Sequence, residues 1–174
     1  MTNTTAKPKL LAISSPGGHW IQLGRLCERL ADRYDIVYAV PNTLFDNAAG
    51  ARARRSYSIT DASADDKWRL LPCAVQVLYI LLRERPHAIL TTGAAPGTVA
   101  VLLGKFLRIR TVWVDSIANV QRISRSGRMV QRRADVFLTQ WEHLRAEPSV
   151  RHEGAVLRSE EHTSELQSPC NLVC

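Results

Sequence analysis

The chain has 174 residues, of which 45% are hydrophobic and 22% are charged, and its formal net charge is +7. This composition is ordinary for one globular domain with a buried core, and it excludes a chain that is disordered throughout. The basic balance favours an anionic partner: a membrane surface, a phosphorylated substrate or a nucleic acid.

The N-terminal residues and the cysteines indicate where the protein works. Met1–Leu10 contains no apolar segment, so we expect no secretory signal. Cys27 and Cys73 lie in apolar helical patterns, and we expect both to be buried free thiols of a cytoplasmic protein. Together with Cys170 and Cys174 they form no metal-ligand spacing, so the sequence predicts neither a metal nor a cofactor.

The C-terminal segment 158–174 differs from the rest of the chain. Arg158–Ser168 reads RSEEHTSELQS and shows no apolar periodicity. It matches, residue by residue, the translation of a common sequencing adapter. We therefore interpret 158–174 as a non-native, disordered tail, with a genuine polar tail as the alternative, and we expect one domain over 1–157 and a native sequence that differs after Leu157.

The first half of the chain predicts two strands and two helices. A short apolar run at 10–13 predicts a buried strand that ends in the turn 14–18. A second strand is expected at 36–40, and the polar residues 42–64 predict a long loop or a broken helix. Apolar residues at helical spacing predict a helix before that second strand and another over 66–84, carrying Leu23, Leu26, Cys27 and Leu30 in the first and Leu71, Val75, Leu78 and Leu82 in the second.

The second half continues the alternation. A strand at 88–91 leads into Gly93–Gly97, where Pro96 suits the first turn of a helix that ends near Leu107. Strands are predicted at 111–114 and 136–138, separated by a basic loop and a short helix within 122–133. Alternating strands and helices predict an α/β fold, a single Rossmann-like domain with a parallel sheet.

Glycines, hydroxyls and ionisable residues follow the predicted strands directly. Parallel sheets bind ligands at the carboxyl ends of their strands, so this placement predicts a ligand site there. The first cluster resembles a phosphate cradle, because Gly17 and Gly18 precede a helix and allow backbone N–H groups to approach an anion. We expect Ser15, Gly17 and Gly18 to bind phosphate. His19 would bind a phosphate or act as a base, and we rank the base first, since imidazole suits proton transfer near neutral pH. The alternative for His19 is a turn residue with a structural role.

Three further clusters are candidates for the same site. Gly93 and Gly97 form a second small-residue loop that would touch a pyrophosphate, or only permit a tight turn. Asp115 would accept a proton from a sugar hydroxyl, or only cap a helix. We add to the ligand-site candidates the polar residues that follow the last two predicted strands, namely Ser116, Gln140 and Trp141.

A membrane contact is predicted from the helix over 66–84. Its apolar run, LLPCAVQVLYILL at 70–82, is too short to span a bilayer. Basic and aromatic residues flank the run, as in a helix lying on an anionic membrane surface, and the expected contacts are Trp68, Arg69, Leu78 and Arg83. The alternative is an ordinary core helix.

A basic stretch in the second half would meet lipid phosphates, nucleic acid or only solvent. It carries Arg122, Arg125, Arg128, Arg132 and Arg133. The aromatic interleaving typical of single-strand binders is missing, and we expect no nucleic-acid partner.

In their order along the chain, four motifs resemble a known family over roughly residues 9–157. They are Ser14–His19, Thr92–Gly97, Val112–Val120 continuing through Ser124–Arg128, and Ala134–Leu144. They are similar to the membrane-anchoring subunit of the two-part N-acetylglucosaminyltransferase that acts second in dolichol-linked oligosaccharide synthesis, and more closely to its bacterial PssD-like relatives in capsule and exopolysaccharide synthesis. The sequence departs from the pattern at Asp115, where many members carry Glu, and it shows no N-terminal transmembrane helix, unlike eukaryotic members.

The resemblance implies the acceptor-side N-terminal half of a GT-B glycosyltransferase, similar to that of the MurG-like lipid II transferase. A partner chain would bind the UDP-sugar, and the complex would transfer N-acetylglucosamine or another hexose to a polyprenyl-pyrophosphate-linked acceptor. His19 or Asp115 would assist deprotonation of the acceptor. The chain would be peripheral to the inner face of the cell membrane and inactive alone. The alternative is a non-catalytic scaffold that recruits and activates the partner.

Overall fold

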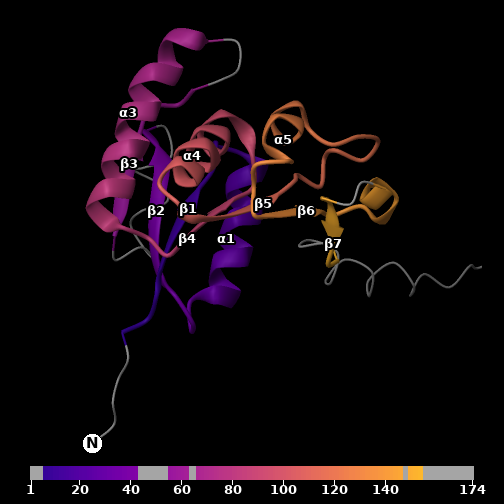
Figure 1. Cartoon of the computed structure of the whole chain (residues 1–174), viewed down its shortest axis with the longest axis horizontal. Helices are drawn as coiled ribbons and strands as arrows, with labels where there is room; N and C mark the ends of the chain where they lie inside the picture. The colour runs from indigo at the N-terminus through magenta and orange to yellow at the C-terminus, as the bar shows by residue number, and fades with distance from the viewer. Residues whose placement is uncertain (1–5, 43–54, 63–65, 147–148, 155–174) are drawn as a thin grey trace, which may run out of the picture.

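The computed structural model describes residues 6–42, 55–62, 66–146 and 149–154. Within these residues a single parallel sheet runs in the order β3-β2-β1-β4-β5-β6-β7 (Figure 1). Its strands are β1 (Lys9–Ile13), β2 (Asp35–Pro41), β3 (Ser56–Ile59), β4 (Ala88–Thr91), β5 (Arg110–Val114), β6 (Val136–Thr139) and β7 (Arg151–His152). The helices are α1 (Gly18–Leu30), α3 (Lys67–Glu84), α4 (Ala94–Phe106), α5 (Arg125–Val130) and the 3-10 helix η1 (Glu142–Ala146).

The predicted α/β architecture is confirmed, and the five predicted strands each lie within one residue of their observed ends. The two edge strands, β3 and β7, were not predicted. β3 lies inside the segment expected to be a loop or broken helix, and it pairs in parallel with β2 from Tyr38↔Ser56 to Pro41↔Ile59. Its sequence, SYSI, contains no apolar run because an edge strand is buried less than a central one. Residues 43–54 and 63–64 of the predicted loop, and the predicted tail, 158–174, lie outside the described residues.

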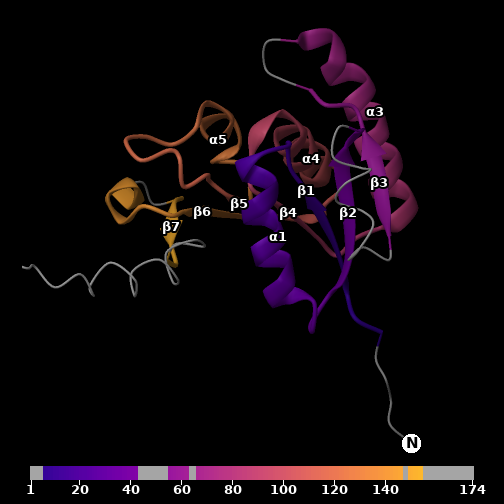
Figure 2. The same ribbon diagram turned by 180° about the vertical axis from the view of Figure 1, so that it is seen from behind.

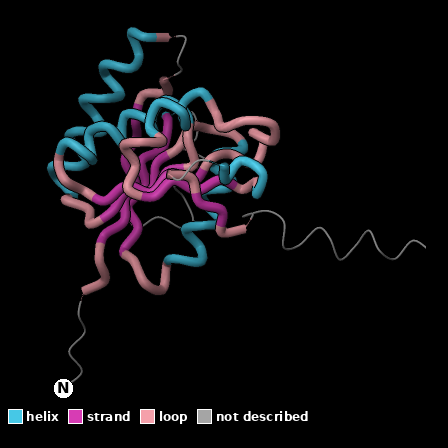
Figure 3. Tube along the Cα trace, turned by 45° about the vertical axis from the view of Figure 1, so that its right-hand side comes forward, coloured by secondary structure: helices cyan, strands magenta, loops and turns pink. Residues whose placement is uncertain are grey.

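The sheet lies between two helical layers. Figures 1 and 2 show α3, α4 and α5 on one face and α1 on the other, and Figure 3 shows the strands between them. The side chains of β1 alternate accordingly: Leu11 and Ile13 join the core beneath α3 and α4, whereas Leu10 and Ala12 join the core beneath α1. A third cluster, centred on the stacked rings of Trp113 and Phe137, lies beneath α4 and α5.

The helix α3 forms where predicted, but its predicted apolar stripe does not face the core. Leu71, Val75 and Leu82 are exposed, and Leu78 is half-buried. A different stripe packs on the sheet, consisting of Cys73, Val77, Ile80 and Leu81. The helix is apolar almost all round, so several stripes have helical spacing, and periodicity alone does not identify the inner one.

The two described cysteines are buried free thiols, as predicted. Cys27 lies between α1 and the sheet, and Cys73 lies between α3 and the sheet. Burial raises the pKa of Cys27 to about 12 and the pKa of Cys73 to about 11. Because the thiolate is the reactive form, these pKa values make both thiols inert at neutral pH.

A buried carboxylate joins three elements at one edge of the sheet. Glu84, the last residue of α3, is 9% exposed, and its Oε2 lies 2.8 Å from the Nζ of Lys9 on β1. The hydroxyl of Tyr57 on β3 donates to the other carboxylate oxygen, Oε1. The Nη1 of Arg55 lies 3.7 Å from Oε2. The hydrogen bond from Lys9, followed by that from Tyr57, lowers the pKa of Glu84.

We expect Glu84→Gln to lower the free energy of unfolding by about 1–2 kcal/mol near pH 7, because the charge-assisted bonds to Lys9 and Tyr57 are lost. The folded-state pKa of Glu84 is depressed, so its stabilisation is complete above the ordinary glutamate pKa and is lost as pH falls through the folded-state value. Urea titrations from pH 7 downward should therefore show the difference between variant and parent shrinking in acid. Asp32→Asn, at an exposed carboxylate, is the control and should change stability by less than about 0.5 kcal/mol. A gap that stays constant with pH would contradict the assignment.

Candidate functional site

The loops that follow β1, β4, β5 and β6 meet at the carboxyl edge of the sheet, as predicted. The loop after β1 contacts the loop after β4, since the ring of His19 reaches the carbonyl of Thr92. Helix α1 also contacts the loops after β5 and β6, where Gln22 reaches Ser116 and Gln140. The edge is therefore one connected polar site rather than four separate turns.

The first loop leaves open space at the start of α1. Gly17 is the N-cap of α1 with φ +83°, a backbone conformation that favours glycine. A Cβ at Gly17 or Gly18 would meet nothing within 4 Å, and both residues are exposed. Ser15 precedes them and is half-buried. Space is therefore open beside the start of α1, and a helix N-terminus favours an anion.

His19 is held by two hydrogen bonds to Thr92. Its Nδ1 lies 2.8 Å from the carbonyl oxygen of Thr92, and the hydroxyl of Thr92 donates to the carbonyl of His19 at 2.7 Å. The ring lies against Gly93, where an added Cβ would come within 3.1 Å of the His19 Cε1. His19 as a whole is half-buried.

The two glycines of the second loop have different surroundings from Gly17 and Gly18. Gly93 is buried, has φ +123° and makes room for the His19 ring. Gly97 is buried in the first turns of α4, and the side chain of Thr91 fills the place that a Cβ would take. Close packing and a tight turn therefore explain both glycines, which was the alternative to pyrophosphate binding in the sequence-based prediction.

Asp115 organises the loop that follows β5. Its carboxylate is 2% exposed and accepts hydrogen bonds from the Trp113 Nε1 at 3.2 Å, from the Asn119 Nδ2 at 3.4 Å, and from the backbone N–H and hydroxyl of Ser124 at 2.9 and 2.5 Å. Ser124 is also the N-cap of α5 and accepts from the Gly127 N–H. A carboxylate enclosed by four donors has no open face for a substrate hydroxyl, so the geometry disfavours the predicted role of Asp115 as a base.

Ser116 and Gln140 belong to a buried hydrogen-bond network that also includes Gln22. Gln140 donates through Nε2 to the Gln22 Oε1 at 3.0 Å and to the Asp115 carbonyl at 2.9 Å. Gln22 in turn donates to the Ser116 hydroxyl at 3.4 Å. The sequence analysis missed Gln22, although its spacing of four from Leu26 places a polar residue on the inner side of α1.

Trp141 closes the outer side of the same loop. Its Nε1 donates to the carbonyl of Ile117 at 2.8 Å, and the Nε2 of His143 lies 2.6 Å from the carbonyl of Val120. The rings of Trp141 and His143 are 6.1 Å apart. Trp141 is half-buried, so part of the ring still lines the edge.

The outer side of α3 carries an apolar stripe, shown by Trp68, which is 90% exposed, and Leu71, which is 70% exposed. Val75, Tyr79 and Leu82 continue the stripe along the helix. Of the predicted membrane contacts, Trp68, Arg69 and Arg83 are exposed, whereas Leu78 is half-buried and lies beside the stripe. None of the helices described is both long and apolar enough to cross a membrane.

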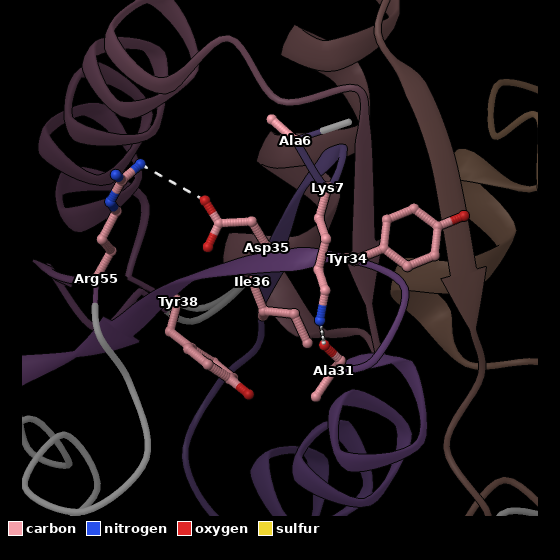
Figure 4. A pocket seen from close by; sticks show the side chains of 8 residues that line it. All are labelled: Ala6, Lys7, Ala31, Tyr34, Asp35, Ile36, Tyr38 and Arg55. Atoms are coloured by element: carbon pink, nitrogen blue, oxygen red, sulfur yellow. Dashed lines mark hydrogen bonds and ion pairs between the residues drawn. The ribbon is translucent and has the colours of Figure 1, made fainter. Parts of the chain in front are cut away.

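Several hollows in the described part of the chain lie away from the Gly17–His19 loop. One of about 560 Å³ lies at the amino edge of the sheet, where the Lys7 Nζ donates to the Ala31 carbonyl at 2.9 Å and Arg55 faces Asp35 at 3.6 Å (Figure 4). Tyr34, Ile36, Tyr38 and Ala6 complete its lining. Another of about 220 Å³ lies beside Gln140 on the α1 side of the sheet. Among the described residues, no group of three or more His, Cys, Asp or Glu side chains is placed to hold a metal ion.

Comparisons with known proteins agree with this arrangement. The family model for "Oligosaccharide biosynthesis protein Alg14 like" matches residues 42–156. Two curated relatives from Cryptococcus neoformans var. neoformans serotype D, each named UDP-N-acetylglucosamine transferase subunit ALG14, are 35% and 36% identical over 81 and 82 residues. These matches cover 42% of the chain, and the chain spans only 35–36% of the length of those relatives.

Solved structures share the fold at low sequence identity. MurG from Acinetobacter baumannii superposes with a TM-score of 0.69 at 11% identity, covering 84% of this chain and 45% of that one. The UDP-N-acetylglucosamine 2-epimerase from Rickettsia bellii gives a TM-score of 0.69 at 15% identity, covering 86% and 45%. The domain thus has the fold of one half of these two-domain proteins, and the predicted fold class is confirmed.

We expect Gly97→Ala to lower the free energy of unfolding by about 1–3 kcal/mol, because the new methyl group would overlap the Thr91 side chain. Gly24→Ala is the matched control, since a Cβ at Gly24 in α1 meets nothing within 4 Å. That substitution should leave stability unchanged or raise it by up to about 1 kcal/mol through helix propensity. Thermal and urea unfolding of the two variants test the contrast, and equal stabilities would refute the packing explanation for Gly97.

Proposed function

Because the chain belongs to the Alg14-like family of oligosaccharide biosynthesis proteins, we propose that it is the acceptor-side subunit of a two-chain glycosyltransferase. The complex would transfer a sugar, N-acetylglucosamine or another hexose, from a UDP-sugar to a polyprenyl-pyrophosphate-linked acceptor. The observation that carries the proposal is the open Gly17–Gly18 loop beside His19, at the carboxyl edge of a domain with the fold of half a GT-B enzyme.

The loop after β1 is the proposed site of the acceptor pyrophosphate. The first turn of α1 has N–H groups without intrahelical partners, and its N-cap Gly17 has no side chain to fill the space ahead of them. The helix dipole adds a partial positive charge at the same place. Ser15 lies two residues before Gly17 and would supply a hydroxyl.

His19 is the proposed base, in preference to Asp115. Its Nε2 would take the proton of the acceptor hydroxyl while that oxygen forms a bond to the anomeric carbon of the donor. The bond from the anomeric carbon to the UDP oxygen would break, its electron pair leaving with UDP, and the configuration would invert. Asp115, Ser116 and Gln140 would then shape the edge, because their polar groups already bond to one another or to neighbouring loops.

A donor-binding partner chain is the second part of the proposed enzyme. The chain covers 45% of MurG, a protein with the same fold in its matching half. The Cryptococcus relatives are named as subunits, which supports a division of the enzyme between chains. We propose that the partner holds the UDP-sugar across the carboxyl edge, and that this chain is inactive alone.

The outer side of the α3 layer is the proposed membrane-docking face, on the cytoplasmic side of the cell membrane. The α3 stripe is apolar, and the Arg83 guanidinium lies 5.9 Å from the Tyr79 ring centroid at its border. Aromatic rings beside cations are typical of helices that lie at the membrane interface. The adjoining helices of the same layer also expose apolar and basic side chains: Leu102 and Phe106 on α4, and Met129, Arg125 and Arg128 on α5. Each basic residue near an anionic surface contributes about 1 kcal/mol to binding.

We expect His19→Ala to lower turnover about 100-fold or more in the complex with the partner subunit, because the proton acceptor is lost. The measurement is sugar transfer from a panel of UDP-sugars to a polyprenyl-pyrophosphate-linked acceptor, with the partner supplied from the same genome. His87→Gln is the control, since His87 lies at the amino edge, where its Nδ1 accepts from the Lys9 N–H. Unchanged turnover in His19→Ala, with this chain still required, would instead identify it as a non-catalytic scaffold.

We expect the double variant Leu71→Asp, Val75→Asp to bind vesicles at least about tenfold more weakly than the parent. Two apolar side chains that would be buried in the membrane are replaced by charged side chains that stay in water. Co-sedimentation with vesicles of equal parts phosphatidylcholine and phosphatidylglycerol measures the change. Ile21→Asp is the matched control, because Ile21 is 58% exposed on α1, which covers the other face of the sheet. An equal loss in the control, or no loss in the double variant, would exclude α3 as the docking face.

A further inference from the structure

Three histidines of the chain form hydrogen bonds that define which ring nitrogen carries the proton. His19 directs Nδ1 at a carbonyl oxygen, that of Thr92, at 2.8 Å. His143 directs Nε2 at a carbonyl oxygen, that of Val120, at 2.6 Å. His87 accepts through Nδ1 from the Lys9 N–H at 3.2 Å. A carbonyl oxygen only accepts and an N–H only donates, so the neutral ring of His19 carries its proton on Nδ1, whereas those of His87 and His143 carry it on Nε2.

We propose that Thr92 is the positioning residue of His19, and that it holds the ring in the tautomer whose Nε2 is free to accept a proton. Thr92 is fully buried and makes two bonds to one residue: its carbonyl accepts from the ring, and its hydroxyl donates to the His19 backbone at 2.7 Å. Two bonds from one rigid residue fix both the ring and the main chain that carries it.

Gly93 completes the positioning element by leaving room for the ring. A Cβ at Gly93 would approach the His19 Cε1 to 3.1 Å and the Nδ1 to 3.4 Å. Any larger residue would therefore push on the ring atoms next to the bond with Thr92. Glycine at position 93 is thus explained by its φ of +123° together with the adjacent imidazole, without a bound phosphate.

The element also stabilises the ring after it takes up a proton. When Nε2 accepts the hydroxyl proton, the ring becomes an imidazolium with N–H groups at both nitrogens, and the Nδ1–H bond to the Thr92 carbonyl becomes charge-assisted. The carbonyl thus orients the base before the transfer and stabilises the cation after it, without itself exchanging a proton. This catalytic consequence rests on the proposed function, whereas the tautomer does not.

The test is long-range ¹H–¹⁵N NMR of the uniformly labelled full chain, at a pH where the imidazoles are neutral, about pH 8.5. Single His→Gln substitutions assign the signals. His19 is expected to show a protonated Nδ1 and an unprotonated Nε2, and His87 and His143 are expected to show the reverse. A mixture of tautomers at His19, or the Nε2–H form, would overturn the proposal.

Two variants of Thr92 separate positioning from folding. Thr92→Val removes the hydroxyl at nearly constant shape and keeps the main-chain carbonyl that the ring contacts. Without the hydroxyl bond to its main chain, His19 is held less firmly against that carbonyl, so its signals should move toward those of a tautomer mixture. Thr92→Ser keeps the hydroxyl and should retain the parent pattern. His87 and His143 should keep their signals in both variants, which reports that the fold is intact. Parent-like His19 signals in Thr92→Val would refute the role of the hydroxyl.

Measurements of turnover in the complex with the partner subunit test the effect of Thr92 on catalysis. Thr92→Val should lower kcat about tenfold with little change in KM for the acceptor, and Thr92→Ser should restore it. If the tautomers are as expected but His19→Ala leaves turnover intact, the positioning element stands and the proposed base is wrong. If the tautomers differ, the positioning element is wrong whatever the turnover.

Discussion

The parallel pairing of β1 with β4 at the centre of the sheet is the constraint on which the site depends. Its register aligns Ile13 with Thr91, so the two strands end side by side and their following loops emerge together. His19 and Thr92, 73 positions apart in the chain, are thereby brought within hydrogen-bond distance. The space between them is small, so glycine suits position 93, and the Gly17–Gly18 loop lies directly alongside.

The candidate site divides its polar groups between an open part and a closed framework. Gly17 and Gly18 are exposed and His19 is half-buried, whereas Asp115, Gln22 and Gln140 are almost fully buried. A buried carboxylate is tolerated only when donors surround it, and four donors surround Asp115. A carboxylate that holds its own loop in place is a poor base, because moving it toward a substrate would break those bonds.

The helix α3 faces two different environments. Cys73, Val77 and Ile80 belong to the core, and Glu84 anchors the end of the helix to β1 and β3. The opposite side remains apolar without packing on any described element. Contiguous exposed apolar surface of this kind is costly in water and marks a place where another phase or protein is bound. The anchoring of one side by a charged network leaves the other side free for docking.

The amino-acid sequence by itself determined the α/β class, five of the strands, and the presence of glycines and ionisable residues at their carboxyl ends, because hydrophobic periodicity and turn residues are local signals. It did not determine which stripe of α3 is inside, because a helix apolar on all sides has no unique inner face. It also did not reveal β3, whose pairing with β2 depends on a neighbour rather than on its own residues. The hydrogen bonds of Asp115, Gln22 and Thr92 were decided only by the tertiary structure, because each joins residues that are distant in the chain or are folded back by a loop.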